Sequence, residues 1–90
     1  MTTVRIPGVL RTLAGGAEEL DIKAGNISEA LIVLTREHPA LRRHLFDDGG
    51  ALRGFINVYL NEEDMRYLAG PETQIKRTDV ITILPSVAGG

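Results

Sequence analysis

Residues 80–90, which read VITILPSVAGG, are the stretch that decides the fold. The aliphatic run at residues 80–84 is typical of a buried β-strand. Pro85 fixes its own φ and biases the residue before it away from helix, so the segment after the strand should be extended. Gly89 and Gly90 have no Cβ and could pass through a channel that excludes side chains. The stretch therefore predicts a last strand followed by a narrow tail that can enter another protein's active site, with an unstructured terminus as the alternative.

Three further strands are predicted upstream of this stretch. The clearest is at residues 55–61, where Ile56, Val58 and Leu60 share one face. Residues 3–6 alternate between polar and apolar side chains, and Val9 with Leu10 could continue that strand beyond a Pro-Gly break. The glycine pair at residues 15–16 supplies a turn before a second alternating segment at residues 20–22. The chain is thus expected to open with a β-hairpin.

One amphipathic helix is predicted between the hairpin and the clearest strand. Asn26 followed three residues later by Glu29 matches a capping box, and Pro39 should end the helical run. The positions at helical spacing on its apolar face are Ile27, Ala30, Leu31 and Leu34. A short turn packed under the sheet is expected to follow, formed by Leu41, Leu45 and Phe46.

The remaining segments complete a mixed sheet. The acidic residues 62–64 should turn the chain, residues 65–68 could form another short strand, and Gly70-Pro71 should turn it again. The order strand, strand, helix, then three strands predicts an α+β fold, with one main helix on one side of a mixed sheet. We expect a single domain over residues 1–90, in which residues 85–90 form a flexible tail.

Size and composition favour a binding or carrier protein. A chain of 90 residues, 43% of them hydrophobic, seldom has room for an enclosed substrate cavity. Ten basic and twelve acidic residues give no broad positive field, which disfavours binding to nucleic acid or to a membrane surface. The absence of cysteine excludes disulfides, thiolate metal sites and a cysteine nucleophile. No apolar run approaches the length of a membrane span, so a cytoplasmic location is expected.

Two adjoining features are candidates for partner binding. If strand alternation holds, Phe55 and Tyr59 lie near Thr82 and Leu84 on the sheet face away from the helix, as an exposed apolar patch with aromatic anchors. The alternative is that Phe55 belongs to the core. The tail could be recognised through strand-like pairing of its backbone. The tail residues in this prediction are Pro85, Ser86, Val87 and Ala88, with Val87 as the side chain that fills a pocket, and Gly89 and Leu84 are also predicted to contact the partner.

The other polar residues do not form a catalytic constellation. His38 and His44 lie six residues apart with no cysteine nearby, so we interpret them as helix-end and surface residues and predict no metal site. Arg42-Arg43 should be a solvated helix end. The acids at residues 62–64 are expected to be hydrated, with charge complementarity to a basic partner affecting at most the association rate.

The sequence resembles the ThiS/MoaD-type β-grasp sulfur carriers, which are ubiquitin-like, and is most similar to their CysO branch. The resemblance covers nearly the whole chain and is most specific in residues 81–90, an aliphatic strand followed by Leu-Pro-Ser-Val-Ala-Gly-Gly. Two positions depart from many relatives: Thr78-Asp79 replaces a glycine before the aspartate, and Asn61-Glu62 replaces Asn-Gly after the central strand. The second departure resembles the CysO branch.

The resemblance implies a sulfur-transfer cycle centred on Gly90. An E1-like activating enzyme of the MoeB/ThiF type would adenylate the Gly90 carboxylate with ATP and Mg²⁺, and a sulfur donor enzyme would supply the sulfur that replaces AMP. The thiocarboxylate would then serve a sulfur-accepting synthase, such as a cysteine synthase dependent on pyridoxal phosphate (PLP) or a ThiG-like thiosugar synthase. A zinc peptidase of the JAMM type could release cysteine. All these cofactors belong to partners, and the chain is expected to be a carrier without enzymatic activity.

Two other functions are open at this point. A ubiquitin-like modifier would pass its activated Gly90 to a lysine of another protein, and Lys23 and Lys76 would offer few points for self-conjugation. An accessory subunit would insert its tail into a partner's active site without being activated. The recipient of the sulfur is also open, since related carriers supply thiamin, molybdopterin and thiosugar synthesis.

Overall fold

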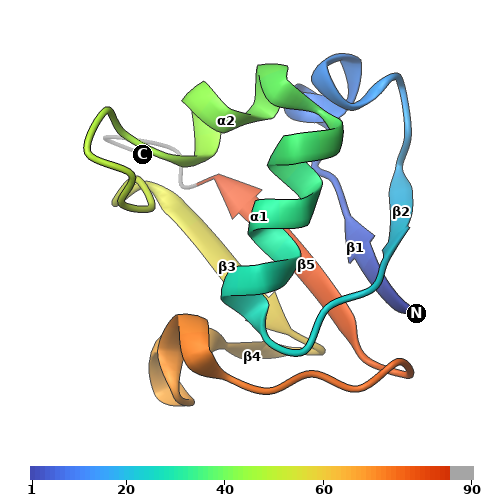
Figure 1. Cartoon of the computed structure of the whole chain (residues 1–90), viewed down its shortest axis with the longest axis vertical. Helices are drawn as coiled ribbons and strands as arrows, with labels where there is room; N and C mark the ends of the chain where they lie inside the picture. The colour runs from blue at the N-terminus through green and yellow to red at the C-terminus, as the bar shows by residue number, and fades with distance from the viewer. Residues whose placement is uncertain (86–90) are drawn as a thin grey trace.

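The computed structural model describes residues 1–85 and shows a five-stranded mixed sheet with two helices (Figure 1). The strands are β1 (Thr2–Arg5), β2 (Glu19–Ile22), β3 (Ile56–Leu60), β4 (Glu63–Asp64) and β5 (Val80–Pro85). The α-helices are α1 (Ile27–Glu37) and α2 (Pro39–Leu45), and the 3₁₀ turns are η1 (Gly8–Ala14), η2 (Met65–Tyr67) and η3 (Gly70–Glu72).

The strands lie side by side in the order β2-β1-β5-β3-β4. The last strand, β5, is therefore central, parallel to β1 and antiparallel to β3. The helix α1 lies across one face of this sheet (Figure 1). The arrangement confirms the predicted α+β fold of the β-grasp type.

The core lies between α1 and the inner face of the sheet. Its largest fully buried side chains come from every layer: Val4, Ile6, Ile22, Ile27, Leu34, Leu41, Leu45, Val58, Ile81 and Ile83. Alternation along β5 buries Ile81 and Ile83 and turns Thr82 and Leu84 towards the opposite face. The alternation along β5 thus fixes which of its side chains face the core.

The start of α1 confirms the Asn26 half of the predicted capping box, whereas the return bond to Glu29 is not formed among residues 1–85. The Asn26 side chain accepts a hydrogen bond from the backbone N–H of Glu29, with an N to Oδ1 distance of 2.8 Å. The end differs in detail, since α1 stops at Glu37 and Pro39 occupies the first turn of α2. Proline is tolerated at that position because its missing N–H has no partner within the helix.

Three local predictions are wrong. Val9 and Leu10 do not extend β1 but lie in η1, where Leu10 and Ala14 are buried. The segment containing Leu41 and Leu45 is the seven-residue helix α2, not a single turn. Residues 65–68 are not a strand: β4 precedes them at Glu63–Asp64, within the acidic residues predicted to turn the chain, and the 3₁₀ turn η2 follows.

Each correction has a physical reason that hydrophobic periodicity cannot indicate. The reason is either a packing contact between segments distant in the sequence or a specific hydrogen bond. The 3₁₀ turn η1 and the helix α2 pack against each other, and each has two buried side chains. The Asp64 carboxylate accepts a hydrogen bond from the Arg66 backbone N–H at 2.8 Å and so turns the chain after β4. Within residues 1–85, none of the helices combines the length and apolar character that crossing a membrane requires.

Candidate functional site

The base of the predicted tail is the end of β5. Pro85 lies opposite Ile56, and Ile83 lies opposite Val58, so the end of β5 is held against the beginning of β3. Ile83 and Val58 both belong to the core, since each is only 1% exposed. The tail residues Ser86, Val87, Ala88, Gly89 and Gly90 lie outside the described residues, so their predicted roles stay predictions.

The face of the sheet away from α1 carries the predicted apolar patch. Leu84 is 44% exposed and Phe55 is 45% exposed, so Phe55 does not belong to the core. Tyr59 is half-buried and lies opposite Thr82, while Leu84 lies opposite Asn57. Phe55 directly precedes Ile56, the partner of Pro85. We call Phe55, Tyr59, Thr82 and Leu84 the outer patch, and it adjoins the base of the tail.

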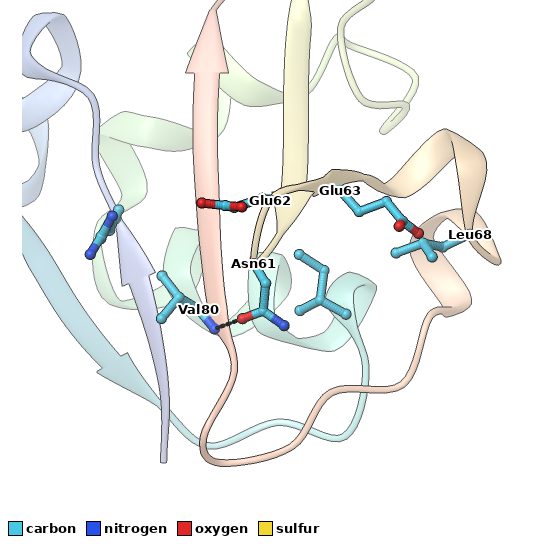
Figure 2. A pocket seen from close by; sticks show the side chains of 7 residues that line it. Asn61, Glu62, Glu63, Leu68 and Val80 are labelled. Atoms are coloured by element: carbon cyan, nitrogen blue, oxygen red, sulfur yellow. Dashed lines mark hydrogen bonds between the residues drawn. The ribbon is translucent and has the colours of Figure 1, made fainter.

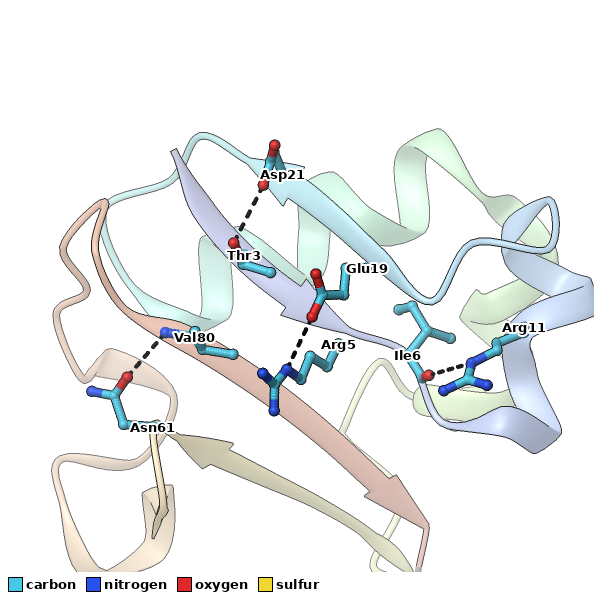
Figure 3. Close-up of polar contacts among 8 residues, drawn as sticks. All are labelled: Thr3, Arg5, Ile6, Arg11, Glu19, Asp21, Asn61 and Val80. Atoms are coloured by element: carbon cyan, nitrogen blue, oxygen red, sulfur yellow. Dashed lines mark hydrogen bonds and ion pairs between the residues drawn. The ribbon is translucent and has the colours of Figure 1, made fainter.

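The rest of this sheet face is polar. Arg5 of β1 contacts Glu19 of β2 through a 3.1 Å ion pair, and the Thr3 hydroxyl donates to Asp21 at 3.3 Å (Figure 3). Both pairs are exposed, so each contributes little to stability. They confine the apolar part of the face to β3 and β5.

Asn61 fixes the start of β5, a role that periodicity did not reveal. Its Oδ1 accepts a hydrogen bond from the Val80 N–H at 3.0 Å (Figure 3), and its Nδ2 donates to Asp79 at 3.2 Å. Its φ is +59°, a left-handed conformation that asparagine adopts more readily than most residues. An asparagine directly after a clear strand is the signal that could have indicated this turn.

The departure at Thr78-Asp79 is accommodated without a left-handed residue. Asn61 is the only residue other than glycine with positive φ among residues 1–85, so Thr78 takes an ordinary backbone conformation. The Asp79 carboxylate instead closes the turn by accepting from the Lys76 N–H at 2.8 Å. The glycine found in many relatives is therefore not required here.

Asp64 and Arg66 form the shortest ion pair that the structure describes, so the prediction that all the acids at residues 62–64 are hydrated is wrong for Asp64. The side chain of Asp64 is only 7% exposed, and its Oδ2 lies 2.7 Å from Nη2 of Arg66, which is itself 67% exposed. Hydrogen bonds from the Arg66 side chain and then from its backbone N–H lower the pKa of Asp64 below the ordinary value of 3.8. The positive charge of Arg66 is thereby paired with Asp64, the residue that caps the same 3₁₀ turn.

The remaining candidates have the surface roles predicted for them. His38 caps the end of α1, and Arg42, Arg43 and His44 occupy the last turn of α2. No group of three histidine or acidic side chains within residues 1–85 could hold a metal ion.

A β-grasp sheet with an exposed apolar patch beside the end of its C-terminal strand is the architecture of the ubiquitin-like class of small carrier and tag proteins. The chain belongs to the ThiS family, whose sequence profile matches residues 4–90. It is 36% identical over 90 residues to the sulfur carrier protein CysO of Mycobacterium tuberculosis, a match that covers 98% of this chain and 97% of the relative.

Solved structures give the same assignment. A chain of the BexX/CysO complex of Amycolatopsis orientalis superimposes with a TM-score of 0.89 at 39% identity, and each chain is covered completely. The small archaeal modifier protein 1 of Methanosarcina acetivorans superimposes with a TM-score of 0.87 at 36% identity, covering 99% of this chain and 95% of that one. The chain is thus similar both to sulfur carriers and to a protein modifier.

Proposed function

We propose that this chain is a sulfur carrier whose reactive group is the carboxylate of Gly90. The observation that carries the proposal is the 36% identity to CysO along almost the entire length of both chains. The position of Pro85, at the end of a central strand and beside the outer patch, supports it. A partner bound to that patch would have the tail within its reach.

The chemistry needs an external activator. A free α-carboxylate has a pKa of about 3.3 to 3.7, so it is ionised at neutral pH and is a poor electrophile. An E1-like enzyme would join the carboxylate to the α-phosphate of ATP and release pyrophosphate, which gives an acyl adenylate. Attack of a sulfur nucleophile on the Gly90 carbonyl would expel AMP and leave a thiocarboxylate. ATP and Mg²⁺ would be held by the enzyme, and the carrier would contribute the tail and no catalytic group.

The outer patch is our candidate for docking that enzyme. Tyrosine and other aromatic side chains contribute a large share of the binding energy at protein interfaces, and Phe55 and Tyr59 flank the exposed Leu84. Beyond Leu84, strand-like pairing of residues 85–88 with the partner would guide Gly89 and Gly90 into its active site.

The sulfur would be delivered to biosynthesis. The similarity to CysO favours a PLP-dependent cysteine synthase as recipient, with a zinc JAMM-type peptidase releasing the product, and a ThiG-like thiosugar synthase is the alternative. The relative crystallised with BexX supports the expectation that a carrier of this shape docks on a folded partner.

Intact-mass spectrometry tests the proposal. The protein would be incubated with its cognate activating enzyme, ATP and a sulfide source. We expect a mass increase of about 16 Da, the difference between sulfur and oxygen, located at Gly90 and absent after deletion of Gly89 and Gly90. No increase with an enzyme shown to be active would contradict the proposal and favour an accessory subunit that inserts its tail without being activated.

A second candidate function is protein modification, which the similarity to the archaeal modifier supports. The activated Gly90 would then form an isopeptide bond with a lysine amine, releasing AMP. Conjugates of higher mass that carry a Gly90 isopeptide in a cell extract would identify this role. Both functions require activation, so adenylation alone does not separate them.

A further inference from the structure

A second surface feature lies at the other end of β5 from the tail. It is a hollow of about 670 Å³, open to solvent, and Figure 2 shows it beside the beginning of β5 and the end of β3. Val80 to Pro85 spans about 17 Å at the usual rise of a strand, which separates the hollow from the base of the tail. The hollow is lined by Arg5, Leu60, Asn61, Glu62, Glu63, Leu68 and Val80.

Three aliphatic residues line the hollow: Leu60 at the end of β3, Val80 at the start of β5 and Leu68 directly after η2. Leu60 and Val80 are half-buried, and Leu68 is 37% exposed. Tyr67, next to Leu68, is 81% exposed. Asn61 holds the strand ends in place through its hydrogen bonds to Val80 and Asp79, so a partner would meet a surface already formed. Apolar side chains recessed in this way suit an aliphatic side chain from a partner.

The rim of the hollow carries uncompensated negative charge. The arginine that lines it, Arg5, is paired with Glu19 at 3.1 Å. Arg66, in the neighbouring turn η2, is paired with Asp64 at 2.7 Å. Glu62 and Glu63 are exposed and have no ion pair within the described part of the chain. The hollow therefore suits a partner segment that places a lysine or arginine beside its aliphatic side chain.

The size of the molecule connects this hollow to the outer patch. A stable protein interface covers about 800 Å² on each partner, which corresponds to a disc roughly 30 Å across. The molecule measures 31 × 28 × 24 Å, and β3 and β5 each contribute residues to both the hollow and the outer patch. A partner seated on Leu84 and Tyr59 would therefore extend over the hollow.

We propose that the activating enzyme grips the carrier at this hollow as well, by placing an aliphatic side chain in the hollow and a basic side chain against Glu62 and Glu63. This proposal rests on the proposed function, because it assigns a second contact to the same enzyme. The apolar lining would contribute affinity, and the acidic rim would speed association at low salt. The contact would not depend on the chemical state of Gly90.

The test is the affinity of the cognate activating enzyme for the carrier, measured by titration calorimetry without ATP. Replacing both acids, Glu62→Lys with Glu63→Lys, should weaken binding about tenfold at low salt and much less at high salt, where charges are screened. Leu68→Ser should weaken binding about fivefold with little dependence on salt. Unchanged circular dichroism and thermal unfolding would show that the variants fold.

Matched controls separate the hollow from general effects. Glu18→Lys with Glu37→Lys makes the same change in net charge at exposed sites outside the hollow, and Ile32→Ser removes an aliphatic side chain that is 49% exposed on α1. Both controls should bind within about twofold of the wild type. Binding by both hollow variants at the affinity of their controls would overturn the proposal.

The binding and adenylation measurements together can reject the hollow without rejecting the proposed function, or the reverse. A wild-type carrier that is adenylated, with hollow variants that bind normally, would leave the proposed function intact and reject the hollow. A carrier that binds the enzyme through the hollow but is never adenylated would support the hollow and reject the proposed function. Absence of any binding to an active enzyme would reject both.

Discussion

At the scale of single residues, two side chains shape the end of the sheet opposite the tail. Asn61 adopts a left-handed conformation and hydrogen-bonds to the start of β5, whereas Asp64 turns the chain after β4 and pairs with Arg66. Both act through specific hydrogen bonds, so their contributions depend on particular atoms and not on hydrophobicity. Together they keep the hollow and its rim in a fixed arrangement.

The Asp64 pair makes stability depend on acid pH. Because the pKa of Asp64 is lowered in the folded state, mainly by the Arg66 hydrogen bonds, its stabilising contribution is present above the ordinary value of 3.8 and is lost as pH falls through the folded pKa. Asp64→Asn keeps a side-chain acceptor for the Arg66 backbone N–H but removes the charge. We expect its urea midpoint to lie below that of the wild type at neutral pH, with the gap closing at strongly acid pH.

The comparison is made by urea unfolding at a series of pH values. Asp21→Asn serves as the control, because the Asp21 carboxylate is exposed and accepts only from the Thr3 hydroxyl. A gap between Asp64→Asn and the wild type that is the same at neutral and at strongly acid pH would show that the charge of Asp64 does not contribute.

At the scale of elements, β5 joins the core to the candidate site. Ile81 and Ile83 hold it between β1 and β3, and the alternate positions Thr82 and Leu84 face outward beside Tyr59. One strand thus supplies core packing, one side of the outer patch and the base of the tail. Substitutions on its outer face should affect partner binding more than folding.

The outer patch is tested by the double change Tyr59→Asp with Leu84→Asp. Charge placed on an apolar docking surface should raise the KM for the carrier about tenfold in ATP/pyrophosphate exchange by the activating enzyme. Val9→Asp is the control, because Val9 is 75% exposed on η1, away from β3 and β5. Normal exchange kinetics with the double variant would remove the outer patch from the proposal.

At the scale of the whole molecule, the hydrophobic core holds β5, the strand that leads to the tail. The buried residues between the sheet and the two helices all lie within residues 1–83. Folding and function should therefore be separable by truncation.

Deletion of Gly89 and Gly90 is the corresponding experiment. The truncated protein should keep a thermal midpoint within about 2 °C of the wild type, because the missing residues contribute no side chain to the core. It should also fail to support ATP/pyrophosphate exchange. A large loss of thermal stability would show that the end of the chain has a structural role, and retained exchange would place the reactive carboxylate elsewhere.

The sequence alone determined the features that depend on neighbours a few residues away. The alternation of residues 80–84 and 56–60 fixed which side chains are core, the Asn26 side chain began α1, and Pro85 lies in extended backbone within β5. Phe55 and Leu84 were found exposed, as predicted. Each of these outcomes follows from local sterics, capping or period.

Only the tertiary structure decided the features that depend on distant partners. Leu10 entered a 3₁₀ turn because packing against α2 buries it, an outcome that a strand-like pattern could not reveal. The Asn61 side chain accepts a hydrogen bond from Val80, nineteen positions along the chain. Arg5 lines the hollow together with Glu62, but its ion pair is with Glu19. The hollow itself is formed from β1, β3, β4, β5 and the residue after η2. Such contacts depend on how the chain folds back on itself, which no local pattern encodes.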